Sequence, residues 1–182
     1  MTKKIALLVG SGSSTSFSKL VAKHLQQLAP TSLQLDIVEI AHLPLYDRDL
    51  DANSPQSYEI FRTQIAQADA YIFITPEHNG SYSAMIKNAI DIGSRPMGQS
   101  LWIGKPAGIV SVGAGAGGGV RAADHLRVIT SGSFINMPTA PFAANIGGLF
   151  NGAFDAEGNP SEAVAATLSG FIKAYADFVA KF

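Results

Sequence analysis

The sequence predicts an α/β fold, in which a parallel β-sheet carries helices on both faces. Short apolar runs alternate along the chain with longer segments whose apolar residues recur at helical spacing, and this alternation is typical of parallel sheets. The run over residues 4–10 is almost entirely apolar, as expected for a strand that is buried on both faces. Polar or glycine-rich segments follow several of the expected strands, at the sheet edge where such folds bind their ligands.

The first part of the chain contains two expected strands and two expected helices. The strand over residues 4–10 ends at a glycine, and the helix over residues 16–28 ends before Pro30. Residues 33–40 alternate apolar and polar positions as a strand does, and residues 57–68 return to helical spacing.

The middle of the chain repeats this alternation. An apolar strand is expected over residues 70–75, and a helix with one apolar face follows over residues 83–92. Residues 106–112 predict a fourth buried strand. A glycine run then leads into a helix that is expected over residues 119–129.

The last part of the chain predicts one short strand and one long helix. The strand is expected over residues 134–137, a loop rich in Gly and Asn over residues 145–159, and the helix over residues 160–182. Five parallel strands in a chain of this length favour a flavodoxin-like order, 2-1-3-4-5. We therefore expect a three-layer sandwich with the sheet in the middle.

Length and composition limit the possible classes of function. With 182 residues, 47% of them apolar and 15% charged, the chain is expected to form a single domain over residues 1–182. Its formal net charge of −1 and its lack of basic clusters argue against a nucleic-acid partner. No cysteine is present, which excludes thiol catalysis, and no apolar segment reaches the roughly 20 residues of a membrane span. We expect a cytoplasmic protein with no membrane partner.

The most informative segment follows the expected third strand and precedes a helix. It contains Pro76, Glu77, His78, Asn79 and Gly80, and a loop at this place is predicted to contact a ligand. Glu77 could act as a general acid or base, but capping a helix start is the more common role of a loop glutamate. His78 has no second ligand at metal-binding spacing, so no metal site is expected.

The loop between the first strand and the first helix is rich in hydroxyl groups. Residues 11–18 contain five serines and one threonine. Such hydroxyls, together with the free amides of a helix start, can bind a phosphate. A helix N-cap is the alternative, but it would need only one serine. We predict phosphate contacts from the following residues: Ser11, Ser13, Ser16, Phe17 and Ser18.

A third loop follows the expected fourth strand and has five glycines among residues 113–119. Its spacing matches the dinucleotide fingerprint, but the position about 20 residues farther on provides no acid for a ribose hydroxyl. We interpret the loop as a close backbone approach to a flat ligand, with Ser111 and Gly113 beside that ligand. A flexible connector explains the composition equally well.

Taken together, these loops resemble those of the NAD(P)H-dependent FMN reductases, a flavodoxin-like family that includes bacterial chromate and quinone reductases. The resemblance is most specific in Thr-Pro-Glu-His-Asn at residues 75–79 and Ile-Lys-Asn-Ala-Ile-Asp at residues 86–91. The chain departs from the family pattern at three positions. Ser13 replaces an arginine, Ser18 replaces an asparagine, and His78 replaces a tyrosine.

The resemblance implies an enzyme that holds FMN, takes hydride from NAD(P)H and passes it to a quinone, a flavin or a similar small acceptor by a ping-pong sequence. It implies that the serine-rich loop binds the FMN phosphate, that residues 76–80 lie along the flavin ring, and that Ser111 and Gly113 border its pyrimidine side. No catalytic side chain is assigned, because the flavin itself carries the hydride chemistry. The family also implies a homodimer or homotetramer.

Two functions from other classes remain open at this point. A flavodoxin-type electron carrier would dock on its partners by charge, and the near-neutral net charge argues against it. A non-flavin regulatory domain would bind a nucleotide at the glycine loop of residues 113–119.

Overall fold

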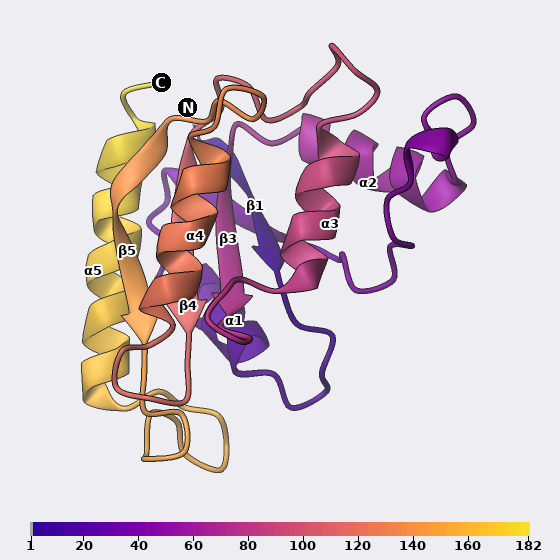
Figure 1. The fold of residues 1–182 in the computed structure, drawn as a ribbon. Coiled ribbons are helices and arrows are strands. Elements are labelled where there is room, and N and C mark those ends of the chain that lie inside the picture. The colour runs from indigo at the N-terminus through magenta and orange to yellow at the C-terminus, as the bar shows by residue number, and fades with distance from the viewer. Residues whose placement is uncertain (1) are drawn as a thin grey trace.

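The computed structural model describes residues 2–182 and contains a five-stranded sheet (Figure 1). The strand order is β2-β1-β3-β4-β5, and all neighbouring strands are parallel. The strands are β1 (Lys3–Val9), β2 (Leu33–Val38), β3 (Ala70–Pro76), β4 (Ala107–Val112) and β5 (Thr139–Ile146). The predicted flavodoxin-like α/β fold and its strand order are confirmed.

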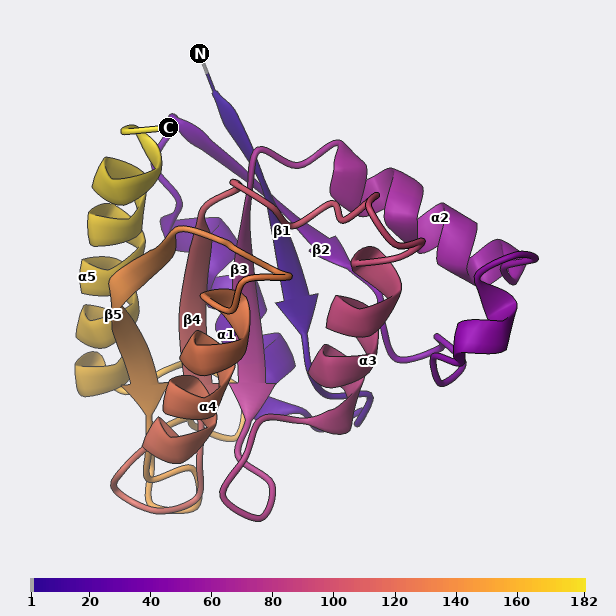
Figure 2. The same cartoon turned by 45° about the horizontal axis from the view of Figure 1, so that its top comes forward.

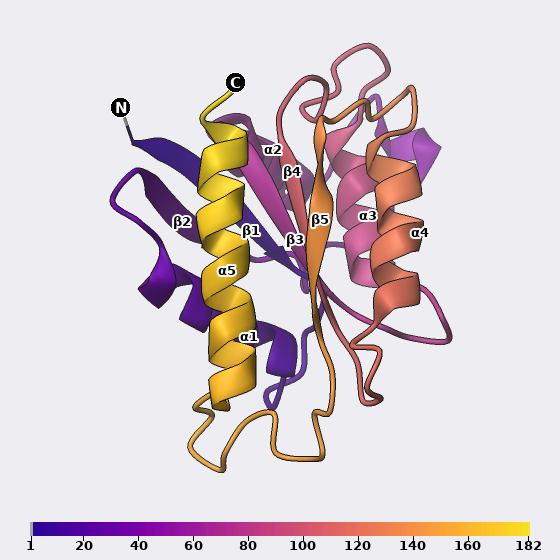
Figure 3. The ribbon, with the colours of Figure 1, turned by 90° about the vertical axis from the view of Figure 1, so that its left-hand side faces the viewer.

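Helices cover both faces of the sheet, as Figure 3 shows. On one face lie α1 (Phe17–Leu28) and α5 (Glu162–Val179). On the other face lie α2 (Gln56–Ala66), α3 (Ala84–Gly93) and α4 (Val120–Thr130). A short 3-10 helix, η1 (Arg48–Leu50), precedes α2. Each of the five α-helices begins and ends within three residues of its expected bounds, whereas η1 was not expected.

The central strands are buried along most of their length because both of their faces are covered. Alternate side chains enter the two separate cores. Leu7 and Ile72 pack toward α1 and α5, whereas Leu8 and Phe73 pack toward α2, α3 and α4. This double burial explains why β1, β3 and β4 read as continuous apolar runs.

Two buried tyrosines connect α5 to the middle of the sheet. The Tyr175 hydroxyl donates a hydrogen bond to the backbone oxygen of Tyr71 at 2.7 Å. The Tyr71 hydroxyl in turn lies 2.9 Å from the oxygen of Ile65 and 3.1 Å from that of Leu101. Both hydroxyls are therefore satisfied inside the protein.

The fifth strand lies elsewhere than the sequence predicts. The expected strand over residues 134–137 is wrong, because β5 covers Thr139–Ile146 and Phe134 is 87% exposed. β5 contains Pro141, which lacks an amide to donate, and the pairing of β5 with β4 shifts register in this region. An edge strand with such an irregularity tolerates a proline. The proline and the small residues around it do not form the apolar pattern of a strand, so the sequence does not predict β5 at this place.

Because the strands are parallel, the loops that follow β1, β3 and β4 meet at one edge of the sheet, the carboxyl edge (Figure 2). The three loops singled out by the sequence are these three loops. No helix within residues 2–182 is both long enough and apolar enough to cross a membrane.

Candidate functional site

The serine-rich loop, residues 10–18, leads from β1 into α1. The Ser16 hydroxyl caps this helix by accepting a hydrogen bond from the Lys19 amide at 3.2 Å. Within residues 2–182, the amides of Ser16, Phe17 and Ser18 donate to no protein oxygen. One serine therefore has the capping role, and the free amides still leave a place for an anion at the start of α1.

The other residues of this loop that are predicted to contact a phosphate differ in exposure. Ser13 is exposed, and its hydroxyl lies 3.3 Å from that of Thr15 and accepts from the Thr15 amide at 3.2 Å. Ser11 and Phe17 are partly buried, and Ser18 is only 2% exposed. The loop thus presents both solvated and enclosed hydroxyl groups at the carboxyl edge.

Gly10 brings the serine-rich loop into contact with the start of α3. A Cβ at this position would lie 2.4 Å from the Ser83 hydroxyl oxygen. Ser83 is the N-cap of α3, and its amide donates to the Thr75 hydroxyl at 3.0 Å. The loops after β1 and β3 are therefore fixed against each other.

The loop after β3 contains a tight turn over residues 78–81. The His78 amide donates to the Ser81 oxygen at 2.9 Å, and the Ser81 amide donates to the His78 oxygen at 3.0 Å. Asn79 has φ 51° and Gly80 has φ 77°, which is the geometry of a type I′ turn. The Asn-Gly pair is the usual sequence signal for this turn, although the turn was not among the features predicted from the sequence. The turn leaves the side chains of His78 and Asn79 exposed.

Glu77 connects this loop to the next one. Its amide donates to the Val112 oxygen at the end of β4, at 2.9 Å. Its carboxylate accepts a longer hydrogen bond, 3.4 Å, from the Ala122 amide in the first turn of α4. The N-cap residue of α4 is Gly119, which has no side chain to offer. Glu77 thus has a capping role, in agreement with the interpretation favoured from the sequence.

The glycine loop, residues 113–119, borders a hollow of about 390 Å³ that Glu77 and Arg121 also line. The loop packs closely on the end of β5, because a Cβ on Gly118 would lie 2.5 Å from the backbone carbon of Asn145. Ser111 is fully buried, and its hydroxyl lies 2.7 Å from the Gly118 oxygen and 2.7 Å from Asn145 Oδ1. Ser111 therefore holds the glycine loop in place through the Gly118 oxygen. Because of this contact, the loop forms a fixed wall of the hollow.

A contact that the sequence analysis missed joins the turn to α4. The Ser81 hydroxyl lies 3.1 Å from His125 Nδ1, and the Tyr82 ring meets the His125 ring edge-on at 6.5 Å. We call the Ser81–His125 pair the turn latch. The two residues are 44 positions apart, so no local pattern in the sequence could reveal the contact.

Ionisable side chains of both signs lie near these loops. Burial raises the pKa of the Tyr82 phenol, and a tyrosine is neutral at physiological pH even without such a shift. Arg121 lines the hollow, and Lys19 Nζ lies 3.5 Å from the Gly12 oxygen in the serine-rich loop. The serine-rich loop offers amides, hydroxyls and a nearby cation, which suit a phosphate. The glycine loop lets a flat group approach the main chain. The two loops together suit a flat ligand that carries a phosphate.

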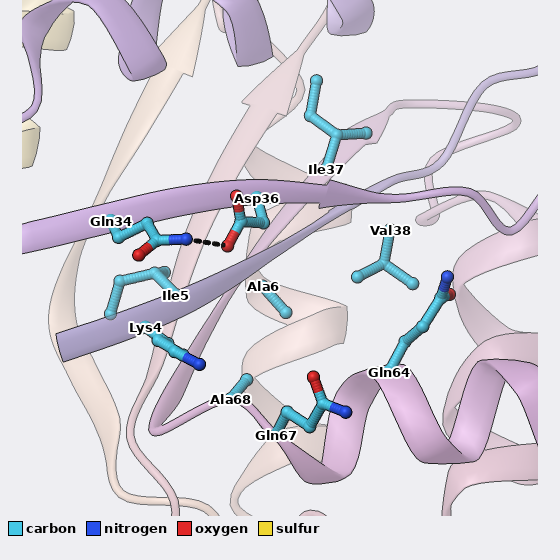
Figure 4. A pocket seen from close by; sticks show the side chains of 10 residues that line it. All are labelled: Lys4, Ile5, Ala6, Gln34, Asp36, Ile37, Val38, Gln64, Gln67 and Ala68. Atoms are coloured by element: carbon cyan, nitrogen blue, oxygen red, sulfur yellow. Dashed lines mark hydrogen bonds between the residues drawn. The ribbon is translucent and has the colours of Figure 1, made fainter.

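Another hollow of about 270 Å³ lies between β1, β2 and α2, and Figure 4 shows the side chains that line it. Within it the Gln34 amide nitrogen donates to Asp36 Oδ2 at 2.9 Å, and Lys4 and Gln67 lie nearby. None of the residues predicted from the sequence to bind a ligand lines this hollow.

Comparison with known proteins agrees with this geometry. The sequence model of the family described as NADPH-dependent FMN reductase matches residues 3–148. A quinone reductase from Pseudomonas putida is 44% identical over 177 residues, which cover 96% of this chain and 94% of that protein. A 2-hydroxy-1,4-benzoquinone reductase from a Burkholderia species is 46% identical over 127 residues, or 70% of this chain and 69% of that protein.

A solved structure extends the comparison to the whole chain. The flavoenzyme NAD(P)H:(acceptor) oxidoreductase FerB from Paracoccus denitrificans superimposes with a TM-score of 0.84 at 35% identity, and the match covers 99% of this chain and 98% of FerB. The family match spans the three loops at the carboxyl edge. This chain therefore belongs to the NADPH-dependent FMN reductase family, as an oxidoreductase that uses FMN as cofactor and NAD(P)H as co-substrate.

Proposed function

We propose that the carboxyl edge of the sheet holds FMN, with its phosphate in the serine-rich loop and its ring beside the glycine loop. The free amides of Ser16, Phe17 and Ser18 carry this proposal, because they offer an anion site at a helix start. The hollow of about 390 Å³ at the same edge offers room for a flat group.

Each predicted residue has a role in this arrangement. The hydroxyls of the serine-rich loop would bind the phosphate, and Phe17 would contribute its amide. These hydroxyls belong to Ser11, Ser13, Ser16 and Ser18. The backbone of residues 76–80 would hydrogen-bond the polar edge of the ring, and Gly113 would allow the ring to approach the main chain. Ser111 would act only by holding the glycine loop. When bound, FMN supplies the hydride chemistry, and the protein orients and shields it.

The direct test is equilibrium binding of FMN to the purified protein. We expect a yellow protein with flavin absorbance, or a colourless one whose melting temperature rises when FMN is added. Replacing Ser16 and Ser18 together by Ala should weaken this binding. A protein that neither absorbs as a flavoprotein nor gains stability from FMN would contradict the proposal.

We infer that the electron acceptor is a quinone or another small oxidant of similar shape. Two relatives with more than 40% identity bear the names of quinone reductases. NAD(P)H and the acceptor would occupy the same exposed place beside the glycine loop in turn. This predicts parallel lines in double-reciprocal plots of initial rate against the concentration of either substrate.

The same assay distinguishes an enzyme from an electron carrier. Steady oxidation of NADPH or NADH with a soluble benzoquinone as acceptor is expected of the enzyme. Intersecting lines would contradict the alternating use of one place, and the lack of any steady oxidation would favour the carrier.

We also infer a homodimer or a homotetramer. The support is an apolar hollow of about 630 Å³ near the end of α3, which Ile103, Met97 and Phe134 line. Met97 and Phe134 are 81% and 87% exposed, and exposed apolar clusters of this kind mark interfaces. Sedimentation at micromolar concentration should give at least twice the 19.1 kDa mass of the chain. A monomer under these conditions would contradict this part of the proposal.

A cytoplasmic location follows from the reaction proposed here. The enzyme consumes NAD(P)H, so it needs a compartment in which that co-substrate is regenerated. Fractionation of cells that express the protein should place NAD(P)H-dependent quinone reduction in the cytosolic fraction, and activity confined to an extracellular or envelope fraction would contradict this location.

A further inference from the structure

The serine-rich loop contains no charged side chain from Gly10 to Ser18. The first charged residue after it is Lys19, the third residue of α1. Side chains on a helix incline toward its N-terminus, and Lys19 follows this rule. Its ammonium nitrogen lies 3.5 Å from the Gly12 oxygen, so the charge is held over the loop.

The position of Lys19 is electrostatically unfavourable in the free protein. A helix start carries partial positive charge, so a cation in the first turn is disfavoured there. The first turn of α1 has no acidic residue to offset this charge. Neither of the two ion pairs found among residues 2–182, Lys87–Asp91 and Arg95–Asp51, includes Lys19.

An anion at the helix start would remove this conflict. The free amides of Phe17 and Ser18 and the ammonium group of Lys19 border the same loop. A phosphate dianion would accept hydrogen bonds from the amides and form a charge-assisted contact with Lys19. An uncharged hydroxymethyl group in the same place would gain little from the ammonium group.

We propose that Lys19 makes the serine-rich loop select phosphorylated FMN over unphosphorylated riboflavin. The inference rests on the proposed binding of FMN at this edge of the sheet. Lys19 would supply the positive charge that residues 10–18 lack. The ammonium group that contacts the phosphate would therefore come from the first turn of α1, and not from a side chain of the loop itself.

The test compares the affinities of two flavins for the wild-type protein and for Lys19→Gln, which keeps a polar side chain of similar length. Flavin fluorescence quenching gives a dissociation constant for FMN and one for riboflavin. We expect Lys19→Gln to weaken FMN binding about ten-fold, because a charged hydrogen bond to phosphate is lost, and to leave riboflavin binding unchanged. Lys19→Arg should restore most of the preference for FMN.

A matched control lies one turn farther along the same helix. Lys23→Gln removes the same charge at an exposed position, and it should leave both dissociation constants within about two-fold of wild type. Raising the salt concentration should weaken FMN binding more in the wild type than in Lys19→Gln, since screening acts on the charged contact.

A measurement without any flavin separates a binding role from a structural one. Lys19→Gln should leave the melting temperature of the FMN-free protein unchanged or slightly higher, because it removes a cation from a helix start. Equal loss of FMN and riboflavin binding together with a lower melting temperature would overturn the proposal in favour of a structural role. An unchanged ratio of the two affinities would overturn it while the binding of FMN still stands. A wild-type protein that binds neither flavin would overturn the proposed function and this inference together.

Discussion

Gly10 sets the distance between two of the loops at the carboxyl edge. A Cβ there would lie 2.4 Å from the Ser83 hydroxyl oxygen and 2.7 Å from the Ile86 side chain. Both distances are far below van der Waals contact, and Ile86 is fully buried. The absence of a side chain at this single position allows β1 and α3 to meet.

Replacing Gly10 by Ala should therefore lower the free energy of unfolding by about 1–3 kcal/mol, the usual effect of overpacking a core. Urea denaturation measures this change. Gly170→Ala is the matched control, because Gly170 lies in α5 with open space around its Cβ position, and it should raise stability by roughly 0.5–1 kcal/mol. Equal stability of Gly10→Ala and wild type would show that α3 can shift at no cost.

At the same scale, the sequence predicted some residue roles and missed others. Local preferences predicted that Glu77 caps a helix start and offered one serine of the loop as an N-cap, but they did not tell which serine or which helix. The structure assigns these caps to Ser16 on α1 and to Glu77 on α4, 45 positions along the chain. The contact of His125 with Ser81 could not be predicted, because the two residues lie 44 positions apart. The place of the Lys19 ammonium group beside the loop was not predicted either, although it follows the general inclination of helix side chains. The role of Ser111 was also hidden, since the sequence does not tell which side of a buried strand its hydroxyl faces.

Among the elements, the turn over residues 78–81 and α4 act as one unit. The turn latch joins their side chains, Glu77 caps the helix from the loop, and a Cβ on Gly80 would lie 3.7 Å from the Arg121 side chain. Two walls of the candidate site therefore come from segments that are bonded to each other. Movement of one wall requires movement of the other.

Ser81→Ala and His125→Phe each remove the hydrogen bond of the turn latch. In His125→Phe, the new phenyl ring can still contact the Tyr82 ring. Loss of one hydrogen bond, worth about 1 kcal/mol, should speed amide hydrogen exchange of His78 and Ser81 roughly five-fold in the FMN-free protein. The double variant should show no further change, because both substitutions remove the same contact. Ser131→Ala, at the other end of α4, breaks a comparable bond to Arg127 and should leave these two amides unaffected. Additive effects of the two latch substitutions would rule out a direct bond.

Element positions could be predicted from the sequence except at β5. Buried central strands and amphipathic helices can be recognised from the spacing of their apolar residues, and here they lie close to their expected bounds. β5 is an edge strand with exposed positions and Pro141, so its pattern resembles that of a loop. The Asn79–Gly80 turn, in contrast, was predictable from its two residues alone.

For the molecule as a whole, the buried tyrosines predict how stability depends on pH. Burial raises the pKa of the Tyr71 and Tyr175 phenols well above that of an exposed tyrosine. Their contribution to stability is complete below a pH of about 10, where the unfolded chain also keeps both protons. Above that pH only the unfolded chain loses them, so stability must fall.

Tyr175→Phe isolates one of the two groups. Between a pH of about 10 and 11.5, the free energy of unfolding of the wild type should fall more steeply than that of the variant, by up to about 1.4 kcal/mol per pH unit. Urea midpoints at several pH values provide the slopes. Parallel slopes would mean that the Tyr175 phenol ionises as easily in the folded protein as in water.

The family match ends at residue 148, whereas α5 begins at Glu162 and covers one face of the sheet together with α1. We expect all 182 residues to fold together for this reason. A gene that ends at residue 148 would encode a sheet with only α1 left on the face that α5 shares, so that part of this apolar core, which includes Ile72 and Val110, would lose its cover. Such a product should collect in inclusion bodies, so cloning boundaries for proteins of this kind belong after the last helix.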